Sequence, residues 1–271
     1  MSHLLIERQP LGPGWVEHWV LNDPASRNAL TAELVQDLQQ ACARAAQDAG
    51  LRAVVLRGAG GSFCAGGSLG GFANSLGQAL APGQPDPLVP MNREFGHLLE
   101  ALCALPQIVL AAVDGPAMGG GLGLVCCADW VLATPGAVLA APEVTLGIVP
   151  AQIAPLVLRR LGDARARRWL LGGERHPAAQ ALADGLVTEV VGDLEEGLSA
   201  RLQTLSAAAP GAVAATKALL QAGQPPLPAW LDLAAQAFAS ALRGPEAAAG
   251  LQAFARKQAA PWRALDGKAR A

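Results

Sequence analysis

The spacing of apolar and polar positions divides the chain into a mixed first part and a helical last part. Short β-branched runs bounded by turn residues predict strands, and apolar positions at helical spacing beside capping residues predict helices. The predicted strands are 3–8, 15–21, 52–57, 108–113, a pair within 129–140, and 186–191. The predicted helices are 31–48, 91–104, 119–128, 151–161, 163–171 and most of the chain after 193.

One unit of this pattern occurs twice. The strands predicted over 52–57 and 108–113 are each followed by a glycine-rich segment. After the strand at 108–113, a helix is predicted to begin at the glycine run 119–121. Between the two units, residues 75–90 contain four prolines and few apolar anchors, which predicts a mobile loop. The body of the protein is therefore predicted to be α/β, followed by an all-helical tail.

The composition excludes several classes of function. Hydrophobic residues make up 52% of the chain and charged residues 15%, so the chain can bury a large core. The net charge of -2 and the absence of tyrosine remove both the basic surface and most of the stacking groups that nucleic-acid binding requires. Low charge also indicates either apolar surface hidden in an oligomer or the alanine-rich composition of a GC-rich genome.

The cysteines and the N-terminal residues indicate in which cellular compartment the protein is expected. Five cysteines with no C-x-x-C pair argue against a disulfide framework and against a zinc site, so no metal is expected. Glu7 and Arg8 interrupt what would be the apolar stretch of a signal peptide, and no apolar run reaches the roughly 18 residues of a membrane span. We expect a soluble, cytoplasmic protein.

The two glycine-rich turns, at 64–68 and 118–122, are the strongest candidates for chemistry. A turn of this kind exposes backbone N–H groups that no helix has used, and a helix starting there adds a partial positive charge. Neither turn matches a nucleotide-binding motif. Two such N–H groups directed at one carbonyl oxygen would stabilise an enolate or a tetrahedral oxyanion.

At these turns the sequence resembles the enoyl-coenzyme A hydratase/isomerase (crotonase) superfamily, over nearly the whole chain. The matching segments, in order, are Asn22-Asp23-Pro24, Arg27-Asn28-Ala29-Leu30, 61–67 (GSFCAGG), Asp114-Gly115, 119–121, Pro142-Glu143, 251–254 (LQAF), Lys257 and Pro261-Trp262. The resemblance implies a crotonase-like ββα spiral over 1–192 and a helical C-terminal trimerisation region over 193–271. It also implies assembly as a homotrimer or hexamer.

The resemblance further implies roles for individual residues. The oxyanion donors would be the N–H groups of Gly67 and Gly120, and Glu143 would be the catalytic acid–base group. The coenzyme A part of the substrate would be bound at Arg27, Ala29, Ala65, Gly66 and Lys257, with Lys257 supplied by the same or by a neighbouring subunit. No separate cofactor is expected, because coenzyme A is part of the substrate.

This chain departs from the family pattern at two places. Hydratases of the family use a second glutamate three positions after the glycine run, where this chain has Gly123. After Pro150 the usual glycine-rich run is replaced by 151–155 (AQIAP). At these two places the chain resembles hydratases of branched glutaconyl-type thioesters, namely the methylglutaconyl- and isohexenylglutaconyl-CoA hydratases. Arg93 is a possible partner for a distal carboxylate, and His97 could reach the acyl pocket.

Three functions therefore remain open. The first is hydration of an α,β-unsaturated acyl-CoA, and the second is double-bond isomerisation, for which one glutamate is enough. The third is a non-catalytic acyl-CoA binding protein. The four histidines have no serine or cysteine partner at a nucleophile elbow, which argues against a Ser-His-Asp hydrolase. Cys64 lies in the first turn, where the family uses the backbone, so its thiol is expected to pack.

Overall fold

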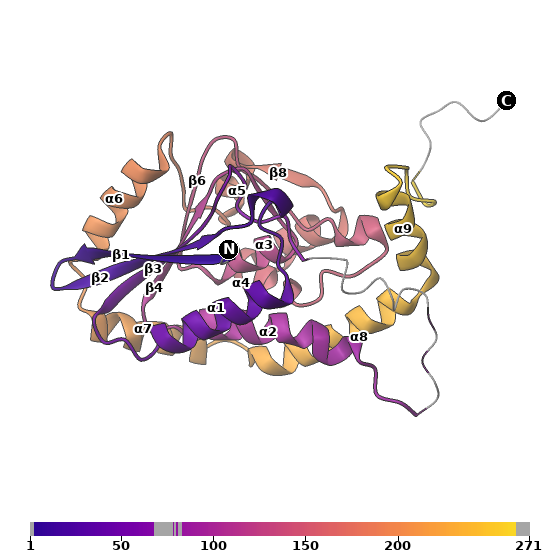
Figure 1. The fold of residues 1–271 in the computed structure, drawn as a ribbon, viewed down its shortest axis with the longest axis horizontal. Helices are drawn as coiled ribbons and strands as arrows, with labels where there is room; N and C mark the ends of the chain where they lie inside the picture. The colour runs from indigo at the N-terminus through magenta and orange to yellow at the C-terminus, as the bar shows by residue number, and fades with distance from the viewer. Residues whose placement is uncertain (1–2, 68–77, 79, 81–82, 264–271) are drawn as a thin grey trace.

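The computed structural model describes residues 3–67, 78, 80 and 83–263. Two sheets form the α/β part (Figure 1). The larger sheet has the order β1-β2-β3-β4-β6-β9, in which β1 and β2 are antiparallel and the remaining pairs are parallel. Its strands are β1 (Leu4–Leu11), β2 (Gly14–Leu21), β3 (Leu51–Gly58), β4 (Ile108–Val113), β6 (Trp130–Ala133) and β9 (Glu189–Val190). The smaller sheet contains β5 (Pro116–Met118), β7 (Val138–Ala140) and β8 (Arg175–Pro177).

Helices cover both faces of the larger sheet. The helical elements are η1 (Pro24–Ser26), α1 (Ala32–Ala45), α2 (Leu88–Ala104), α3 (Gly120–Cys127), η3 (Glu143–Leu146), α4 (Ala154–Leu171), α5 (Ala178–Asp184), α6 (Leu194–Leu205), α7 (Pro210–Ala222), α8 (Leu227–Arg243) and α9 (Pro245–Ala255). Figure 1 shows α1 and α2 on one side of the sheet and α6 on the other.

Alternation along β2 explains this arrangement. Side chains of successive strand residues point to opposite faces of a sheet. Trp19 and Leu21 join the main core beneath α1, whereas Val16 joins a separate cluster that includes Leu198 of α6. The parallel part of the sheet is therefore buried on both faces, as parallel sheets generally are, whereas most of the edge strand β1 is exposed.

The predicted α/β body and helical tail are confirmed, with local corrections. The predicted break between 151–161 and 163–171 appears as Gly162, whose φ of 72° and ψ of 167° interrupt α4. Helix α2 begins at Leu88 instead of residue 91, so the predicted loop 75–90 is too long. Residues 75–77, 79 and 81–82 of that loop lie outside the described residues. The strand predicted over 186–191 is shortened to β9, and β8 was not predicted at all.

Among the described residues, no helix combines the length and the apolar character needed to cross a membrane.

Candidate active site

The first glycine-rich turn follows β3 and is fixed by Asn28. This asparagine is fully buried and has a left-handed backbone with φ of 58°. Its Nδ2 donates to the carbonyl oxygens of Ala59, at 2.9 Å, and Ser62, at 2.8 Å, and its Oδ1 accepts from the N–H of Asp23 at 2.9 Å. Asparagine tolerates the left-handed region better than most residues, and its amide satisfies three backbone groups that would otherwise be buried alone.

The segment after Asn28 runs alongside residues 65–67. Ala65 N–H donates to the carbonyl of Arg27 at 2.9 Å, and Leu30 N–H donates to the carbonyl of Gly66 at 2.8 Å. Arg27 also has a left-handed backbone, and its side chain is exposed. Four of the five residues predicted to bind coenzyme A (Arg27, Ala29, Ala65 and Gly66) therefore come from two adjacent segments.

The second turn connects β5 to α3. Gly119 adopts φ of 51° and ψ of -117°, a conformation that favours glycine, and α3 begins at Gly120. The N–H groups of the first turn of a helix have no partner within the helix, so the Gly120 N–H is free of the α3 ladder. The sequence prediction that the helix starts in this glycine run is confirmed.

The two turns lie side by side. Cys64 N–H donates to the carbonyl of Pro116 at 3.0 Å, and Met118 N–H donates to the carbonyl of Cys64 at 2.9 Å. A β-carbon added to Gly66 would lie 2.8 Å from the Met118 oxygen and 3.6 Å from the Gly120 nitrogen. A β-carbon on Gly67, in contrast, would meet no described atom within 4 Å. Residues 66 and 67 therefore lie close to the start of α3, and no other described residue fills the space at Gly67.

Glu143 extends over this second turn. It is the first residue of η3, and its Oε1 lies 2.7 Å from the position of a β-carbon on Gly119. Its Oε2 is out of contact with solvent and has no hydrogen-bond partner among the described residues. Burial raises the pKa of this carboxyl group from 4.5 to about 7, because the charged form loses its hydration. A buried carboxyl with a pKa near neutrality is suited to proton transfer.

The space above Gly123 is filled by apolar side chains. A β-carbon there would lie 2.6 Å from Cγ2 of Ile153 and 3.6 Å from Cζ of Phe95. Phe95 also lies 3.3 Å from a β-carbon placed on Gly120. Phe95 and Ile153 therefore form a wall beside the second turn. These two residues are not evident from the sequence, because the apolar pattern of a helix does not distinguish a residue beside a functional turn from any other core residue.

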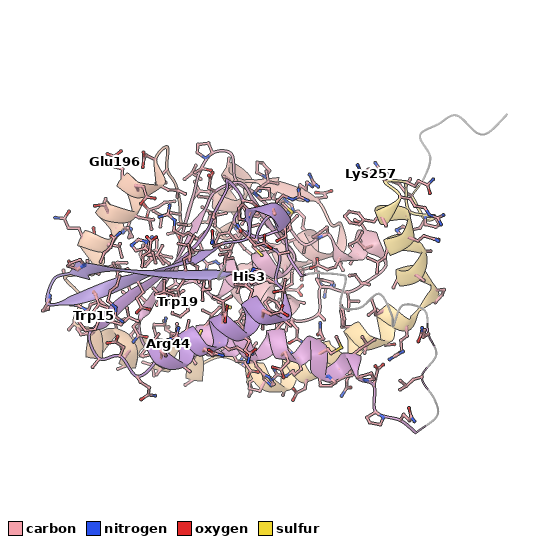
Figure 2. The ribbon with its side chains drawn as sticks, viewed as in Figure 1. His3, Trp15, Trp19, Arg44, Glu196 and Lys257 are labelled. Carbon is pink, nitrogen blue, oxygen red and sulfur yellow. The ribbon has the colours of Figure 1, made fainter. Side chains whose placement is uncertain are left out.

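Several other candidates lie away from this group. Lys257 follows α9 and is exposed (Figure 2), and its backbone N–H donates to the carbonyl oxygen of Phe254 at 3.0 Å. Arg93, considered above for a distal carboxylate, is already paired with Glu100 at 2.5 Å and Asp232 at 2.6 Å. His97 is half-exposed beside Glu94.

Cys64 is completely buried, and burial raises the pKa of its thiol to about 12, which excludes a thiolate at neutral pH. Its Sγ accepts from the Gly66 N–H at 3.4 Å. The thiol therefore packs within the turn and supports its backbone.

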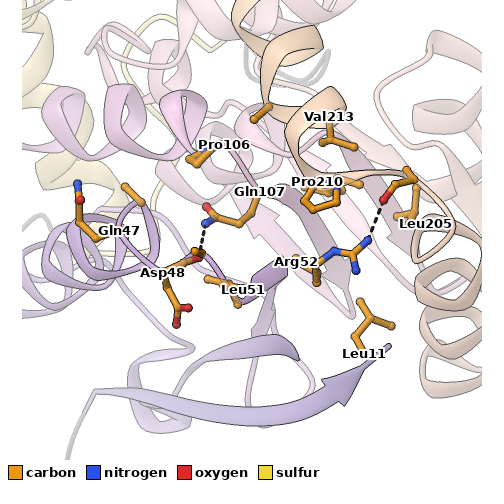
Figure 3. A pocket seen from close by; sticks show the side chains of 16 residues that line it. Leu11, Gln47, Asp48, Leu51, Arg52, Pro106, Gln107, Leu205, Pro210 and Val213 are labelled. Carbon is orange, nitrogen blue, oxygen red and sulfur yellow. Dashed lines mark hydrogen bonds between the residues drawn. The ribbon is translucent and has the colours of Figure 1, made fainter. Parts of the chain in front are cut away.

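A cavity of about 260 Å³ lies where β3 and β4 begin, at the other end of these strands from the glycine-rich turns (Figure 3). It is lined by Leu51, Arg52 and Gln107, together with residues of the segment leading into α7. None of the predicted site residues lines it, so we do not assign the candidate chemistry to this cavity.

The two sheets, the C-terminal helices and the two glycine-rich turns that meet beside the half-buried Glu143 are the features expected from the resemblance to the crotonases. The sequence model of the enoyl-CoA hydratase/isomerase family matches residues 16–265, so the chain belongs to that family. A protein of Rhodobacter capsulatus described as "Probable enoyl-CoA hydratase" is 35% identical over 243 residues, covering 88% of this chain and 90% of that protein.

Solved structures agree. An enoyl-CoA hydratase/isomerase from Marinobacter aquaeolei is 40% identical, with a TM-score of 0.76 over 96% of this chain and 98% of that one. Pseudomonas aeruginosa AtuE is 41% identical, with a TM-score of 0.75 over 96% of this chain and 99% of that one. The predicted α/β crotonase fold with C-terminal helices is therefore confirmed.

Proposed function

We propose that this protein is an enoyl-CoA hydratase that adds water reversibly to an α,β-unsaturated acyl-CoA, with Glu143 as its acid–base group. The observation that carries the proposal is the position of the Glu143 carboxyl group. It lies over Gly119, has one oxygen with no hydrogen-bond partner in the described part of the chain, and lies beside the two turns that supply Gly67 and Gly120. The family membership makes an acyl-CoA the expected substrate.

The proposed mechanism uses the backbone for charge and the carboxylate for protons. The thioester oxygen accepts from the N–H groups of Gly67 and Gly120. Glu143 takes a proton from water, and the water oxygen forms a bond to the β-carbon while the C=C electron pair moves to the thioester oxygen. The enolate then collapses as Glu143 returns the proton to the α-carbon. Loss of one oxyanion donor costs about 10²–10³ in rate in comparable enzymes.

The finer proposal concerns the acyl group. The apolar wall of Phe95 and Ile153 replaces the second carboxylate of typical hydratases, and Ile153 belongs to the departing segment 151–155. A branched glutaconyl-type enoyl-CoA is consistent with these departures and with the 41% identity to AtuE. Because Arg93 is paired with two carboxylates, we do not propose that it binds a distal carboxylate of the substrate.

Double-bond isomerisation is the second candidate, and one observation favours it. Glu143 is the only carboxylate that the described residues place beside the two turns, and moving one proton between two carbons requires only one. In isomerisation Glu143 would remove a proton from the γ-carbon or α-carbon and return it to the other, with no water added.

The test is a panel of crotonyl-, 3-methylglutaconyl- and longer branched enoyl-CoA substrates assayed in D2O. Hydration removes the conjugated enone absorbance and adds the mass of one D2O molecule. Isomerisation exchanges deuterium without adding the mass of water. Water addition to one substrate supports the leading proposal, whereas exchange alone would replace it with isomerisation.

A variant separates an enzyme from a binding protein. We expect Glu143→Gln to lower kcat by about 10²–10⁴, the typical contribution of general acid–base catalysis. Binding of a saturated acyl-CoA, measured by calorimetry, should be retained. Glu196→Gln, on the exposed surface of α6, is the matched control and should leave both unchanged. A wild-type protein that binds acyl-CoA but turns over no substrate of the panel would support the non-catalytic alternative.

A further inference from the structure

Two consecutive residues of the segment 151–155 fit into gaps that glycines leave on two different helices. Gly96 is a buried position in α2, and Gly123 is a buried position in α3. A β-carbon on Gly96 would overlap with Oε1 of Gln152 and lie 3.1 Å from its Cδ. A β-carbon on Gly123 would lie 2.6 Å from Cγ2 of Ile153. Each glycine therefore leaves the space that one side chain of this segment occupies.

The side chain of Gln152 is held by both of the helices between which it lies. It is 2% exposed. Its Nε2 donates to Oδ1 of Asn92 in α2 at 2.8 Å and to the carbonyl oxygen of Leu231 in α8 at 3.0 Å. A backbone carbonyl only accepts, so the bond to Leu231 fixes which end of the amide faces α8. Gln152 therefore ties the segment before α4 to α2 and α8, which lie side by side (Figure 1).

The other end of the amide lies beside α2. Oε1 of Gln152 and Nη1 of Arg93 are both buried, and neither has a hydrogen-bond partner among the described residues. Both lie next to Gly96, where a β-carbon would be 2.8 Å from Nη1 of Arg93. A buried polar side chain of this kind contributes less to stability than an apolar one of the same length would. What its two hydrogen bonds add is one defined side-chain position.

The next residue in the chain is the one that faces the second glycine turn. Ile153 is the residue before α4 and is 3% exposed. With Phe95 it forms the apolar wall beside Gly120 and Gly123. Consecutive Cα atoms are about 3.8 Å apart, so a displacement of residue 152 moves residue 153 with it. Gly123 has no side chain that could hold Ile153 in place from α3.

We propose that Gln152 is a positioning residue that fixes Ile153 against Gly123 and so sets the space available to the acyl group. This inference rests on the proposed function, because it takes the acyl group to lie beside the second glycine turn. Gln152 is buried and acts through Ile153, without contact with the substrate. When its two hydrogen bonds are lost, the segment 151–155 withdraws from α3, and the site accepts a bulkier acyl group.

The test compares the dissociation constants of two saturated thioesters, butyryl-CoA and 3,3-dimethylbutyryl-CoA, by calorimetry on the full-length protein. Their coenzyme A parts are identical, so the ratio of the two constants reports on the acyl group alone. We expect Gln152→Met to shift this ratio about tenfold in favour of the bulkier thioester, as one methylene group does in an apolar pocket. Ile153→Ala should shift it in the same direction. Gln39→Met is the matched control, because Gln39 of α1 also donates to α2, at the carbonyl of Glu94, and the ratio should not change.

Two milder variants keep the test decisive if Gln152→Met does not fold. Asn92→Ala removes only one of the two acceptors, and it should shift the ratio in the same direction by a smaller factor. Gly96→Ala fills the gap from the side of α2. Alanine favours a helix over glycine, so this change would raise Tm if the gap were unused. We expect Tm to fall and the ratio to shift as it does for Gln152→Met.

An unchanged ratio in Gln152→Met or Asn92→Ala would overturn the positioning role, as would a higher Tm for Gly96→Ala. An unchanged ratio in Ile153→Ala would overturn it too, because the acyl group would then lie elsewhere. The measurement uses binding, so it is independent of turnover. A protein that shows the expected shifts but hydrates no thioester keeps the positioning role and loses the proposed reaction. A protein that hydrates its substrate with an unchanged ratio in these variants gives the opposite result.

Discussion

At the residue scale, the surroundings of Glu143 account for its proposed role. An isolated carboxyl group would be ionised at pH 7 and hydrated, and it would be a weak base. Here burial raises its pKa to about 7, and no cation among the described residues pairs with it. The group can therefore accept and return a proton at neutral pH with little energetic cost in either direction.

This pKa predicts the pH dependence of the reaction. The base form of Glu143 is the ionised form, so kcat/KM should rise tenfold per pH unit below about pH 7 and level off above it. The measurement is kcat/KM for the best enoyl-CoA substrate between pH 5 and 9. A flat profile over this range would show that another group limits the reaction.

The raised pKa of Glu143 also makes the stability of the folded protein depend on pH. A folded-state pKa raised from 4.5 to about 7 favours folding when Glu143 is protonated, and this contribution is lost as the pH rises through 7. The variant Glu143→Gln cannot ionise. It should therefore match the wild type in urea unfolding at pH 4 and exceed it in stability at pH 8. Equal stabilities at both pH values would mean that the carboxyl group is solvated.

Some of this site could be predicted from the sequence, and some could not. The glycine runs and Pro142-Glu143 are local signals, and their neighbours in the chain identify them. The proximity of Glu143 to Gly119 depends on how η3 packs against another turn, which no local pattern records. The filling of the space at Gly123 by Phe95 and Ile153 depends on packing between α2, α3 and the start of α4.

At the scale of elements, the first turn is held by three buried side chains. The side-chain amide of Asn28 hydrogen-bonds to Asp23, just before η1, and to Ala59 and Ser62 in the loop after β3. It therefore joins the two segments that flank the proposed coenzyme A site. The loop is also anchored by Phe63 and Cys64, which are completely buried in the main core. We infer that the amide of Asn28 and these two side chains together determine the position of Gly66 and Gly67.

Replacement of Asn28 by alanine should therefore be costly. It would leave one buried and two partly buried backbone groups without this partner, at up to about 1–3 kcal/mol each, and would place alanine in the left-handed region. We expect the free energy of unfolding to fall by about 3–5 kcal/mol in urea titrations. Arg27→Ala is the control, because Arg27 shares the left-handed backbone but has an exposed side chain. A loss below about 1 kcal/mol for Asn28→Ala would show that water replaces its amide.

The elements themselves were predicted unevenly, for physical reasons. Strand β4 is an uninterrupted apolar run, and β2 and β3 are largely apolar, with polar residues only at 17–18 and at 52 and 57. The predicted ranges differ from the observed ones by one residue or less at each end. Strand β8 is three residues long, includes Arg175 and Pro177, and exists because it pairs with β7. Its signal is tertiary, and the sequence carries no trace of it. Gly162 ended a helix as predicted, because its positive φ requires glycine.

At the scale of the whole molecule, the C-terminal helices pack against the turn that carries Glu143. A β-carbon on Gly250 of α9 would lie 2.3 Å from the carbonyl oxygen of Leu146, and one on Gly147 would lie 2.5 Å from the backbone of Glu246. Backbones in such close contact leave little freedom for η3. Helix α9 therefore supports the position of the proposed acid–base group from outside the α/β part.

The protein surface next to the contact between η3 and α9 is apolar and contains a cavity. A cavity of about 560 Å³ lies between η3, the end of α4 and the segment after α9, with Phe254 and Trp262 among its lining residues. Leu171, Phe254 and Trp262 are 69%, 61% and 45% exposed. Large apolar side chains grouped around a hollow usually mark an interface. We expect the homotrimer or hexamer predicted from the sequence to bury this surface.

Phe254→Glu tests this expectation, because a charge placed in an apolar interface loses hydration without gaining a partner. For the wild type we expect a light-scattering mass of three or six times the 27.6 kDa chain, and for the variant a smaller mass. Because α9 supports η3, activity should fall together with the mass. Leu219→Glu is the control: Leu219 is 74% exposed on α7, away from the hollow, and its replacement should leave mass and activity unchanged. A monomeric wild type, or a fully assembled Phe254→Glu variant, would show that subunits do not meet at this surface, and Lys257 could then not reach a neighbouring site from here.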